Sequence, residues 1–309
     1  MDNEVHLVDS PKKNPRNPPR NPDRILSTHL LLKSPAVGAL LLWMIVPLAM
    51  TLWFSFQRYN LLNPDVSGFA GLDNYTSLVT DPSLWTAMWN TLVLVGSVLA
   101  ITVVLGTLLA VLFDQEFFGR GVARLLIIAP FFVMPTVSAL IWKNMLLHPV
   151  NGMVAFLMRS VGLSAIDWFG AWPMSAVVVI VSWQWLPFAL LILLTAVQSL
   201  DQEQREAAHL DGAGPLRMFF FITLPHLRRS ITVVLMIETI FFLSVFAEIF
   251  VTTSGGPGLA TTNLAYLIYV RSLLEYDVGS ASAGGVIAIV LANIVAIFLV
   301  RTIATSLEA

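Results

Sequence analysis

The sequence predicts an all-α protein that crosses a membrane with six helices. Its composition is 57% hydrophobic and only 12% charged, its mean hydropathy is +0.78, and long stretches contain no charged residue. Soluble globular domains carry about 25% charged residues, so this composition is typical of a polytopic membrane protein. A spanning helix needs roughly 20 apolar residues because the hydrocarbon core of a bilayer is about 30 Å thick.

Charge-free intervals mark the predicted spans, because a charged side chain at mid-bilayer costs about 2.5 to 3.5 kcal/mol. Pro47, Pro135 and Pro187 lie inside spans, where membrane helices tolerate kinks. The third run is broken near its outer end by Lys143 and His148, so a re-entrant or surface helix is the alternative there. The six predicted spans are residues 35–56, 89–113, 121–147, 173–197, 230–253 and 279–300.

Positive charges predict the orientation, since cytosolic loops of membrane proteins carry an excess of Lys and Arg. With the N-terminus inside, all but four of the 17 Lys and Arg residues fall on the inner side. We therefore expect both termini, and the loop between the fourth and fifth spans, in the cytosol. The four basic residues expected outside are Arg58, Lys143, Arg159 and Arg271.

Composition also divides the chain into two regions. Residues 1–29 are rich in Pro and Asn and are too polar for a cleaved signal peptide, so we expect a disordered cytoplasmic tail. Residues 30–305 are the predicted six-helix transmembrane domain. That domain includes a polar cytosolic loop at residues 198–229, which interrupts two long apolar runs.

Missing chemistry excludes several function classes. The net charge is -2 and the basic residues are not clustered, so membrane lipid is an expected partner and nucleic acid is not. No lysine follows a glycine, so no Gly-Lys-Ser/Thr phosphate loop exists. The five histidines show no metal-ligand spacing, there is no cysteine, and no Gly-x-Ser-x-Gly elbow occurs. We expect no catalytic residue, metal or cofactor in this chain.

The polar loop at residues 198–229 predicts a helix, a turn and a second helix. Asp201 suits a helix N-terminus, and Asp211-Gly212 supplies a turn with positive φ that ends the first helix. The small side chains of Ala207 and Ala208 would let another surface approach closely. An ordinary connection between two helices is the alternative interpretation.

Residues Glu206 to Pro225 read EAAHLDGAGPLRMFFFITLP, which resembles the EAA motif of ABC importer permeases at its characteristic spacing. GLDNYTSL at residues 71–78, Asn90-Thr91-Leu92 and SGGP at residues 254–257 resemble carbohydrate-uptake permeases of the maltose type. The resemblance covers about residues 35–301 and implies a six-transmembrane-helix type I ABC importer permease. The matched motif positions are Glu206, Ala207, Ala208, Asp211, Gly212, Ala213, Phe219, Ile222, Leu224 and Pro225.

This resemblance implies a permease subunit of an ATP-driven, binding-protein-dependent importer in a bacterial inner membrane. The implied partners are a second homologous permease, a dimeric cytosolic ATPase that binds ATP and Mg, and a periplasmic or lipid-anchored substrate-binding protein. The EAA loop would form a coupling helix seated in a groove of the ATPase. Its expected coupling residues are Glu206, Ala207, Ala208, Asp211, Gly212 and Ala213.

The fifth predicted span carries two acidic residues, Glu238 and Glu248, and acidic residues inside a membrane are functional candidates. At helical spacing Glu238, Phe241, Phe242 and Val245 form one stripe, and a carboxylate beside aromatic rings suits a polyhydroxylated ligand. Simple helix packing is the alternative for this stripe. By resemblance to the maltose-type sugar site, the expected substrate path comprises Gln184, Trp185, Phe188, Glu238, Phe241 and Phe242.

Two further stretches, SVFAEIFVTT at residues 244–253 and DVGSASAGG at residues 277–285, resemble polyol-uptake permeases and favour sorbitol or mannitol. One rival is a proton-coupled secondary transporter of a small polar solute with Glu238 and Glu248 as proton sites. A second rival is a membrane-embedded enzyme whose site would require the convergence of Lys143, His148 and Asp167.

Overall fold

The computed structural model describes residues 22–307, and most of these residues are helical. Residues up to Met50 belong to one unit and residues from Thr51 onward to a second. Residues 1–21 of the predicted tail lie outside the described residues. The last part of that tail, predicted to be disordered up to residue 29, is instead helical, because α1 (Pro22–Ser55) begins at Pro22. Proline fits the first turn of a helix, where its missing N–H has no partner to lose.

The other elements follow α1 in chain order, the first group of eleven before the fourth predicted span begins at Pro173. The first group comprises β1 (Gln57–Arg58), η1 (Pro64–Val66), β2 (Gly68–Phe69), α2 (Asp73–Thr80), α3 (Pro82–Asp114), α4 (Arg120–Ile128), η2 (Ala129–Phe132), α5 (Pro135–Ile141), η3 (Trp142–Leu146), α6 (Met153–Ser160) and α7 (Trp168–Ala171). The second group comprises α8 (Pro173–Gln198), α9 (Gln202–Leu210), α10 (Pro215–Met218), η4 (Phe219–Thr223), α11 (Leu224–Phe242), α12 (Ala247–Thr252), α13 (Leu264–Tyr269), η5 (Val270–Leu274) and α14 (Val278–Leu307).

The all-α membrane fold is confirmed, apart from the antiparallel pair of two-residue strands β1 and β2. Within residues 22–307, five helices are long and apolar enough to span a membrane, and a bent helix pair brings the number to as many as 6. The predicted first, second, fourth and sixth spans correspond to α1, α3, α8 and α14. The five candidates that count as single helices are Lys33–Ser55, Pro82–Asp114, Pro173–Gln198, Pro215–Phe242 and Val278–Phe298.

The third predicted span, residues 121–147, is not one continuous helix. Its two halves, Arg120–Phe132 and Pro135–Leu146, meet at an angle of 109°. The break falls at Met134, which is extended with φ -61 and ψ 140, because the ring of the following proline disfavours helical geometry in the residue before it. This bend matches a broken span or the re-entrant alternative.

The fifth predicted span, residues 230–253, is wrong in position. The apolar helix runs instead from Pro215 to Phe242, because the aromatic segment of the motif continues into α11 through the π-helical turn η4. Arg228 and Arg229 do not interrupt it, since both are exposed and long basic side chains can extend away from apolar surface. After α11 the chain leaves the helix before α12 begins at Ala247.

The interior of the second unit lies between α3, α8 and α11. Leu94 and Val98 of α3, Val177 and Val181 of α8, and Phe242 of α11 belong to one buried cluster. Farther along the same two helices, a Cβ added at Gly106 would stand 3.0 Å from the Cβ of Ala189, so the backbones of α3 and α8 approach closely there. Small residues at such contacts favour helix packing in membranes.

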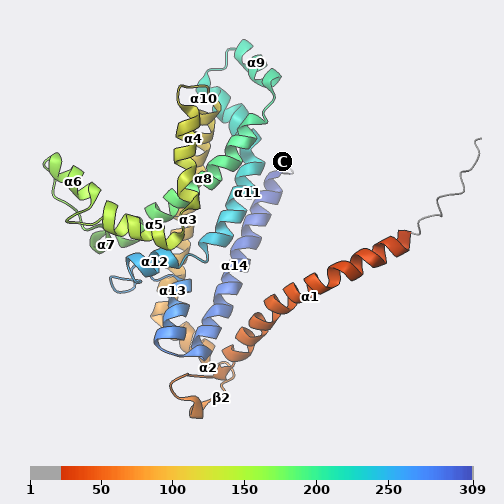
Figure 1. Ribbon diagram of the computed structural model, residues 1–309, viewed down its shortest axis with the longest axis vertical. Helices are drawn as coiled ribbons and strands as arrows, with labels where there is room; N and C mark the ends of the chain where they lie inside the picture. The colour runs from red at the N-terminus through yellow and green to blue at the C-terminus, as the bar shows by residue number, and fades with distance from the viewer. Residues whose placement is uncertain (1–21, 308–309) are drawn as a thin grey trace, which may run out of the picture. The chain divides into compact units, whose positions relative to one another are not determined.

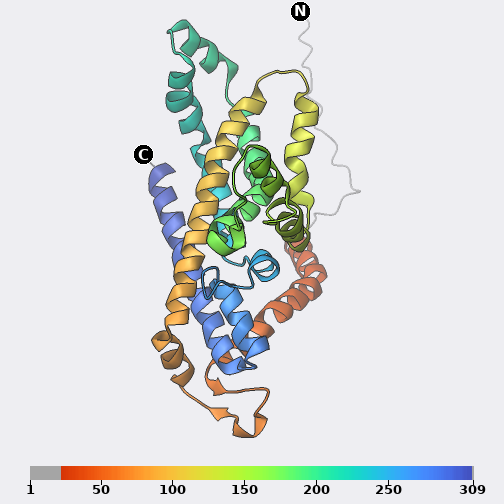
Figure 2. The same cartoon turned by 90° about the vertical axis from the view of Figure 1, so that its left-hand side faces the viewer.

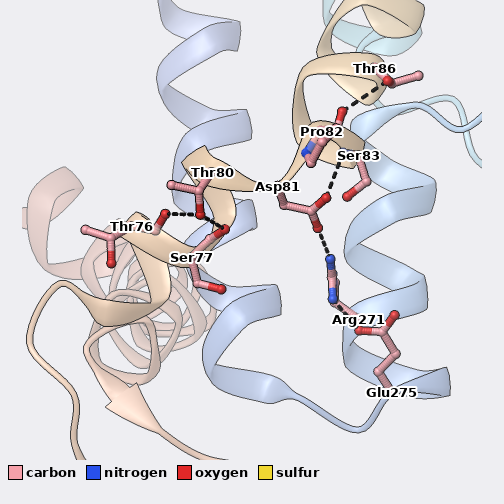
Figure 3. A network of polar contacts seen from close by, with 9 residues as sticks. All are labelled: Thr76, Ser77, Thr80, Asp81, Pro82, Ser83, Thr86, Arg271 and Glu275. Atoms are coloured by element: carbon pink, nitrogen blue, oxygen red, sulfur yellow. Dashed lines mark hydrogen bonds and ion pairs between the residues drawn. The ribbon is translucent and has the colours of Figure 1, made fainter.

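The second unit has two distinct ends. Helix α3 runs from one end to the other, with α9 and α10 at one end and α2 and β2 at the other (Figures 1 and 2). At the end near α2, Asp81 caps α3 by accepting a hydrogen bond from the backbone N of Ser83 at 2.8 Å. Arg271 of η5 pairs with Asp81 and also with Glu275, the latter at 2.7 Å (Figure 3).

The surroundings of Asp81 set its protonation. Partial burial raises its pKa, whereas hydrogen bonding from Ser83 and the positive charge of Arg271 lower it, and the net result is a pKa below the ordinary 3.8. The carboxylate is therefore charged near neutral pH. It links the N-terminus of α3 to η5, two segments far apart in the sequence.

Candidate functional site

The polar loop forms the predicted helix, turn and second helix. Asp201 starts α9 by accepting a hydrogen bond from the backbone N of Glu203 at 3.0 Å. The helix ends at Leu210, and the chain then turns at Gly212, whose φ is 79°, while the N of Ala213 donates to the carbonyl of Ala208 at 2.9 Å. This hydrogen bond across five residues, with a left-handed glycine after the last helical turn, is a Schellman motif. The expected turn at Asp211-Gly212 is confirmed.

The expected coupling residues lie together at the free end of the loop. Glu206, Ala207, Asp211 and Gly212 are exposed, and Ala208 and Ala213 are half-buried. Leu210, at the end of α9, keeps 89% of its surface exposed although it is apolar. Among the described residues α9 has no buried side chain, so the packing of this chain leaves most of its surface free to contact another protein.

A basic residue that the sequence analysis did not select attaches α9 to the bundle. Arg205 pairs with Asp114 at the end of α3, with 2.7 Å between Nη1 and Oδ2. Its other terminal nitrogen donates to the carbonyl oxygen of Val197, near the end of α8, at 2.6 Å. Arg205 directly precedes the EAA residues, but nothing in the sequence places Asp114 opposite it.

Glu238 of α11 lies in the interior of the bundle and is fully buried. Its Oε2 lies 2.6 Å from Oγ1 of Thr102 on α3. Its other oxygen, Oε1, has no hydrogen-bond partner among the described residues. A buried carboxyl oxygen without a partner is costly in a membrane interior, so this position is a strong candidate for a functional polar group. Thr102 was missed, although a hydroxyl in an apolar span is a usable signal.

Trp185 is the centre of an aromatic cluster that includes two residues from the helix of Glu238. Its ring centroid lies 4.7 Å from that of Phe241, 5.5 Å from that of Phe242 and 5.9 Å from that of Phe188. The ring of Phe131 in η2, which the sequence analysis did not select, lies 5.7 Å from Trp185. The structure therefore brings together four of the six residues expected in the substrate path, with Glu238 on the same helix as two of them.

The remaining predicted residue, Gln184, takes a different position. It is buried, and its Nε2 donates to the carbonyl oxygen of Val133 at 2.8 Å, beside the break in the third span. The interrupted backbone there needs such a partner, since no water is available in a bilayer core. The side-chain oxygen of Gln184 has no partner within the described part of the chain. Its role in a substrate path stays a prediction.

The predicted stripe from Glu238 to Val245 is only partly correct. Glu238 and Phe242 are both fully buried, but Phe241 is 51% exposed. Val245 lies beyond the end of α11, where its carbonyl accepts a hydrogen bond from Nδ2 of Asn263 at 2.6 Å. The helical spacing used for the stripe does not apply past Phe242 because the helix stops there.

The residues proposed for an enzyme site do not converge. Nζ of Lys143 donates to the carbonyl of Val251 at 2.8 Å, and Nδ1 of His148 accepts from the backbone N of Val150 at 3.2 Å. Asp167 caps α7 by accepting from the N of Gly170. His148 and Asp167 thus stabilise their own local backbone, whereas Lys143 bonds to the backbone of α12. In the described ranges no cluster of three or more His, Cys, Asp or Glu could hold a metal ion.

Helices of spanning length, an internal polar centre and an exposed helical loop define a multi-span membrane protein of the permease class. Residues 103–309 match the family described as binding-protein-dependent transport system inner membrane component. The chain belongs to this family. Membership favours a binding-protein-dependent permease over the rival hypothesis of a proton-coupled secondary transporter.

Three similar proteins are named as transporter permeases, and two of the names refer to a carbohydrate or its derivative. The probable ABC transporter permease protein y4oQ of Sinorhizobium fredii is 35% identical over 84% of each chain. The sulfoquinovosyl glycerol transport system permease protein SmoG of Agrobacterium fabrum is 32% identical over 92% of each chain. The trehalose/maltose transport system permease protein MalF of Thermococcus litoralis is 33% identical over 80% of this chain and 84% of its own.

A solved structure supports the fold. It is described as a bacterial ABC transporter involved in the import of the acidic polysaccharide alginate. The matching chain is 23% identical, with a TM-score of 0.77, over 92% of this chain and 96% of its own length. At this identity the match shows a shared fold and says nothing about the ligand.

Proposed function

We propose that this chain is one permease subunit of an ATP-driven, binding-protein-dependent carbohydrate importer. It would lie in a bacterial inner membrane with both termini in the cytoplasm. The observation that supports this function best is the exposed helix α9, which ends in the Gly212 turn and carries the EAA residues (Figure 1). A helix with no buried side chain contributes little to the packing of its own chain, so its surface is suited to a partner protein.

The proposed partner at α9 is a dimeric cytosolic ATPase, which would bind ATP and Mg. The docking residues would be Glu206, Ala207, Ala208, Asp211, Gly212 and Ala213, all at the same end of the loop. When the ATPase dimer closes, α9 would move with it, and the bundle would change between inward-open and outward-open states. Nucleotide chemistry would stay on the ATPase.

The proposed importer contains two more components. A second homologous permease would complete the path, and a periplasmic or lipid-anchored binding protein would deliver the ligand. Support for the binding protein comes from the family description and from a related solved structure of an alginate ABC transporter in complex with an alginate pentasaccharide-bound periplasmic protein.

For the ligand we propose a polyhydroxylated compound, and more narrowly a sugar alcohol such as sorbitol or mannitol. The unpartnered oxygen of Glu238 offers an acceptor for a hydroxyl group, and the Trp185 cluster offers ring surfaces for a carbon skeleton. Because Glu238 is fully buried in this conformation, contact with a ligand requires the bundle to open. The named relatives concern sulfoquinovosyl glycerol and trehalose or maltose, so the polyol preference depends on the sequence resemblance.

The test is co-purification of the chain with its partners, followed by reconstitution in proteoliposomes. We expect ATP-dependent uptake and ligand-stimulated ATPase activity when the binding protein is present. A panel of sorbitol, mannitol, maltose, trehalose and sn-glycerol-3-phosphate identifies the ligand class. Uptake driven by a proton gradient without ATP would contradict the proposal, and uptake of disaccharides alone would reject the polyol preference.

A further inference from the structure

We propose that the Arg205–Asp114 ion pair is the connection through which movement of α9 reaches the membrane helices. The inference rests on the proposed function and adds a positioning residue to it. In this view α9 and the end of α3 move as one body when the ATPase closes. Arg205 contacts neither ligand nor nucleotide, and it acts by holding two elements together.

The geometry around Arg205 supports this role. A cavity of about 290 Å³ separates α9 and α10 from the ends of α3 and α8, and both Arg205 and Asp114 line it. The guanidinium group binds the side chain of Asp114 at 2.7 Å and the backbone carbonyl of Val197 at 2.6 Å. One side chain therefore connects α9 to two spanning helices across a space that is otherwise not filled by packing.

Few other contacts could replace this connection. Of the residues in α9, only Arg205 and Ala208 are half-buried, and the rest are exposed. Among the described residues, the side-chain hydrogen bonds from α9 to other elements are those of Arg205, since the bond from Gln202 to Glu206 stays within the helix. Without Arg205 the helix would be attached mainly through its two backbone connections. A force applied to α9 would then bend the loop instead of moving α3.

The charges explain why the two residues depend on each other. Asp114 is the last residue of α3, where a negative charge is unfavourable because the helix C-terminus already carries partial negative charge. The positive charge of Arg205 compensates the carboxylate of Asp114 and the partial charge of the helix end. The side chain of Arg205 is only 28% exposed and that of Asp114 only 18%, so solvent screens their attraction incompletely. Arg124 of α4 adds a second positive group by donating to the carbonyl of Phe113 at 3.0 Å.

The same helix continues to the polar centre. α3 carries Asp114 at its end and Thr102 within the membrane segment, and Thr102 contacts Glu238 of α11. If the end of α3 moves, Thr102 moves with it and acts through its contact with Glu238 on α11. Helix α3, with one polar contact near its end and another within the membrane segment, therefore joins the loop to the proposed substrate path.

The first experiment uses the complete reconstituted transporter and measures ATP hydrolysis and uptake in parallel. We expect Arg205→Ala to assemble with the ATPase and to hydrolyse ATP, but to lower the uptake per ATP about fivefold, the scale of known coupling energies. The charge exchange Arg205→Asp with Asp114→Arg should restore at least half of the loss. Glu203→Ala, an exposed change on the same helix, is the matched control and should behave like the unaltered chain.

A second experiment uses the absence of cysteine in this chain. The paired substitutions Arg205→Cys and Asp114→Cys allow a short thiol-reactive crosslinker to join the two positions after assembly. If the two positions move as one body, the crosslinked transporter retains uptake and its coupling ratio exceeds that of the uncrosslinked double variant. Loss of uptake on crosslinking would show that the pair must separate, which overturns the proposal.

The outcomes separate this inference from the proposed function. If the unaltered chain shows no ATP-dependent uptake, the proposed function itself fails. If the unaltered chain transports and Arg205→Ala keeps the same uptake per ATP, only the connection through Arg205 is rejected. Loss of ATPase co-purification in Arg205→Ala would also reject it, because Arg205 would then act in docking.

Discussion

Thr102 of α3 and Glu238 of α11 are joined inside the helix bundle, with 2.6 Å between Oγ1 and Oε2. Thr102 also lies 3.0 Å from the carbonyl oxygen of Val98, one turn earlier in its own helix. A hydroxyl group has one hydrogen to donate but can also accept. The pair can therefore connect two helices with the carboxyl group as acceptor or, when protonated, as donor.

Replacement of Glu238 by alanine should reduce uptake about tenfold, equivalent to about 1.4 kcal/mol in the activation barrier. Glu238→Gln should keep more activity, because its amide can still form a hydrogen bond with Thr102. Initial uptake rates in proteoliposomes measure both effects. The control is Glu248→Ala, at another buried acidic residue. Equal and small losses in Glu238→Ala and Glu248→Ala would remove Glu238 from the proposed substrate path.

Gly212→Ala should weaken coupling while leaving insertion into the membrane unchanged. Gly212 has a φ of 79°, and a side chain in this left-handed region costs about 1 to 2 kcal/mol. An added Cβ at Gly212 would meet nothing within 4 Å, so backbone strain alone would cause the effect. ATPase stimulation by the loaded binding protein is the measurement.

Gly214→Ala is the matched control for that change. Its φ is -72°, and a Cβ there also meets nothing within 4 Å, so alanine fits without strain. We expect normal coupling in this variant. If both alanine variants lose coupling equally, the loss reflects contact with the partner and not the left-handed turn.

Gly106→Leu should destabilise the contact between α3 and α8 by about 1 to 3 kcal/mol. The first added carbon already lies 3.0 Å from the Cβ of Ala189, and the backbone of Leu190 leaves little room for a shift. The thermal unfolding midpoint in detergent measures the change. Gly96→Leu, on the same helix but with nothing within 4 Å of an added Cβ, should unfold close to the unaltered protein.

The Asp81–Arg271 pair predicts a pH dependence of stability. Because the folded pKa of Asp81 lies below 3.8, the charged carboxylate stabilises the fold above that pH, and the stabilisation is lost as the pH falls through the folded pKa. Asp81→Asn, which can still cap α3, should cost about 0.5 to 1 kcal/mol at pH 7.

The difference in unfolding midpoint between Asp81→Asn and the unaltered chain should shrink as the pH falls below 3.8. High salt should also reduce it, because the pair is partly exposed to solvent. A difference that stays constant between pH 7 and pH 3 would show that charge is not the cause. Thr86→Val, at the start of α3 but without a charge, serves as a control and should show no pH dependence.

The sequence by itself determined the membrane class, most of the spans and the helix-turn-helix form of the polar loop at residues 198–229. These features depend on local properties: apolar length sets a span, Asp201 sets the start of α9, and Asp211-Gly212 sets its end. Residues 22–29 were predicted from composition to be disordered but are helical, because propagation of the helix Pro22–Ser55 does not require hydrophobic residues at every position.

Only the tertiary structure decided which distant side chains meet. Thr102 with Glu238, and Asp114 with Arg205, lie 136 and 91 residues apart in the chain, and no local pattern records such pairings. The break at Met134 has a local cause in Pro135, but the side chains that bond to the interrupted backbone are distant in sequence: Gln184 bonds to Val133, and Asn263 bonds to Val245 after the end of α11. Local chemistry sets the elements, and packing between helices decides which polar groups they bring together.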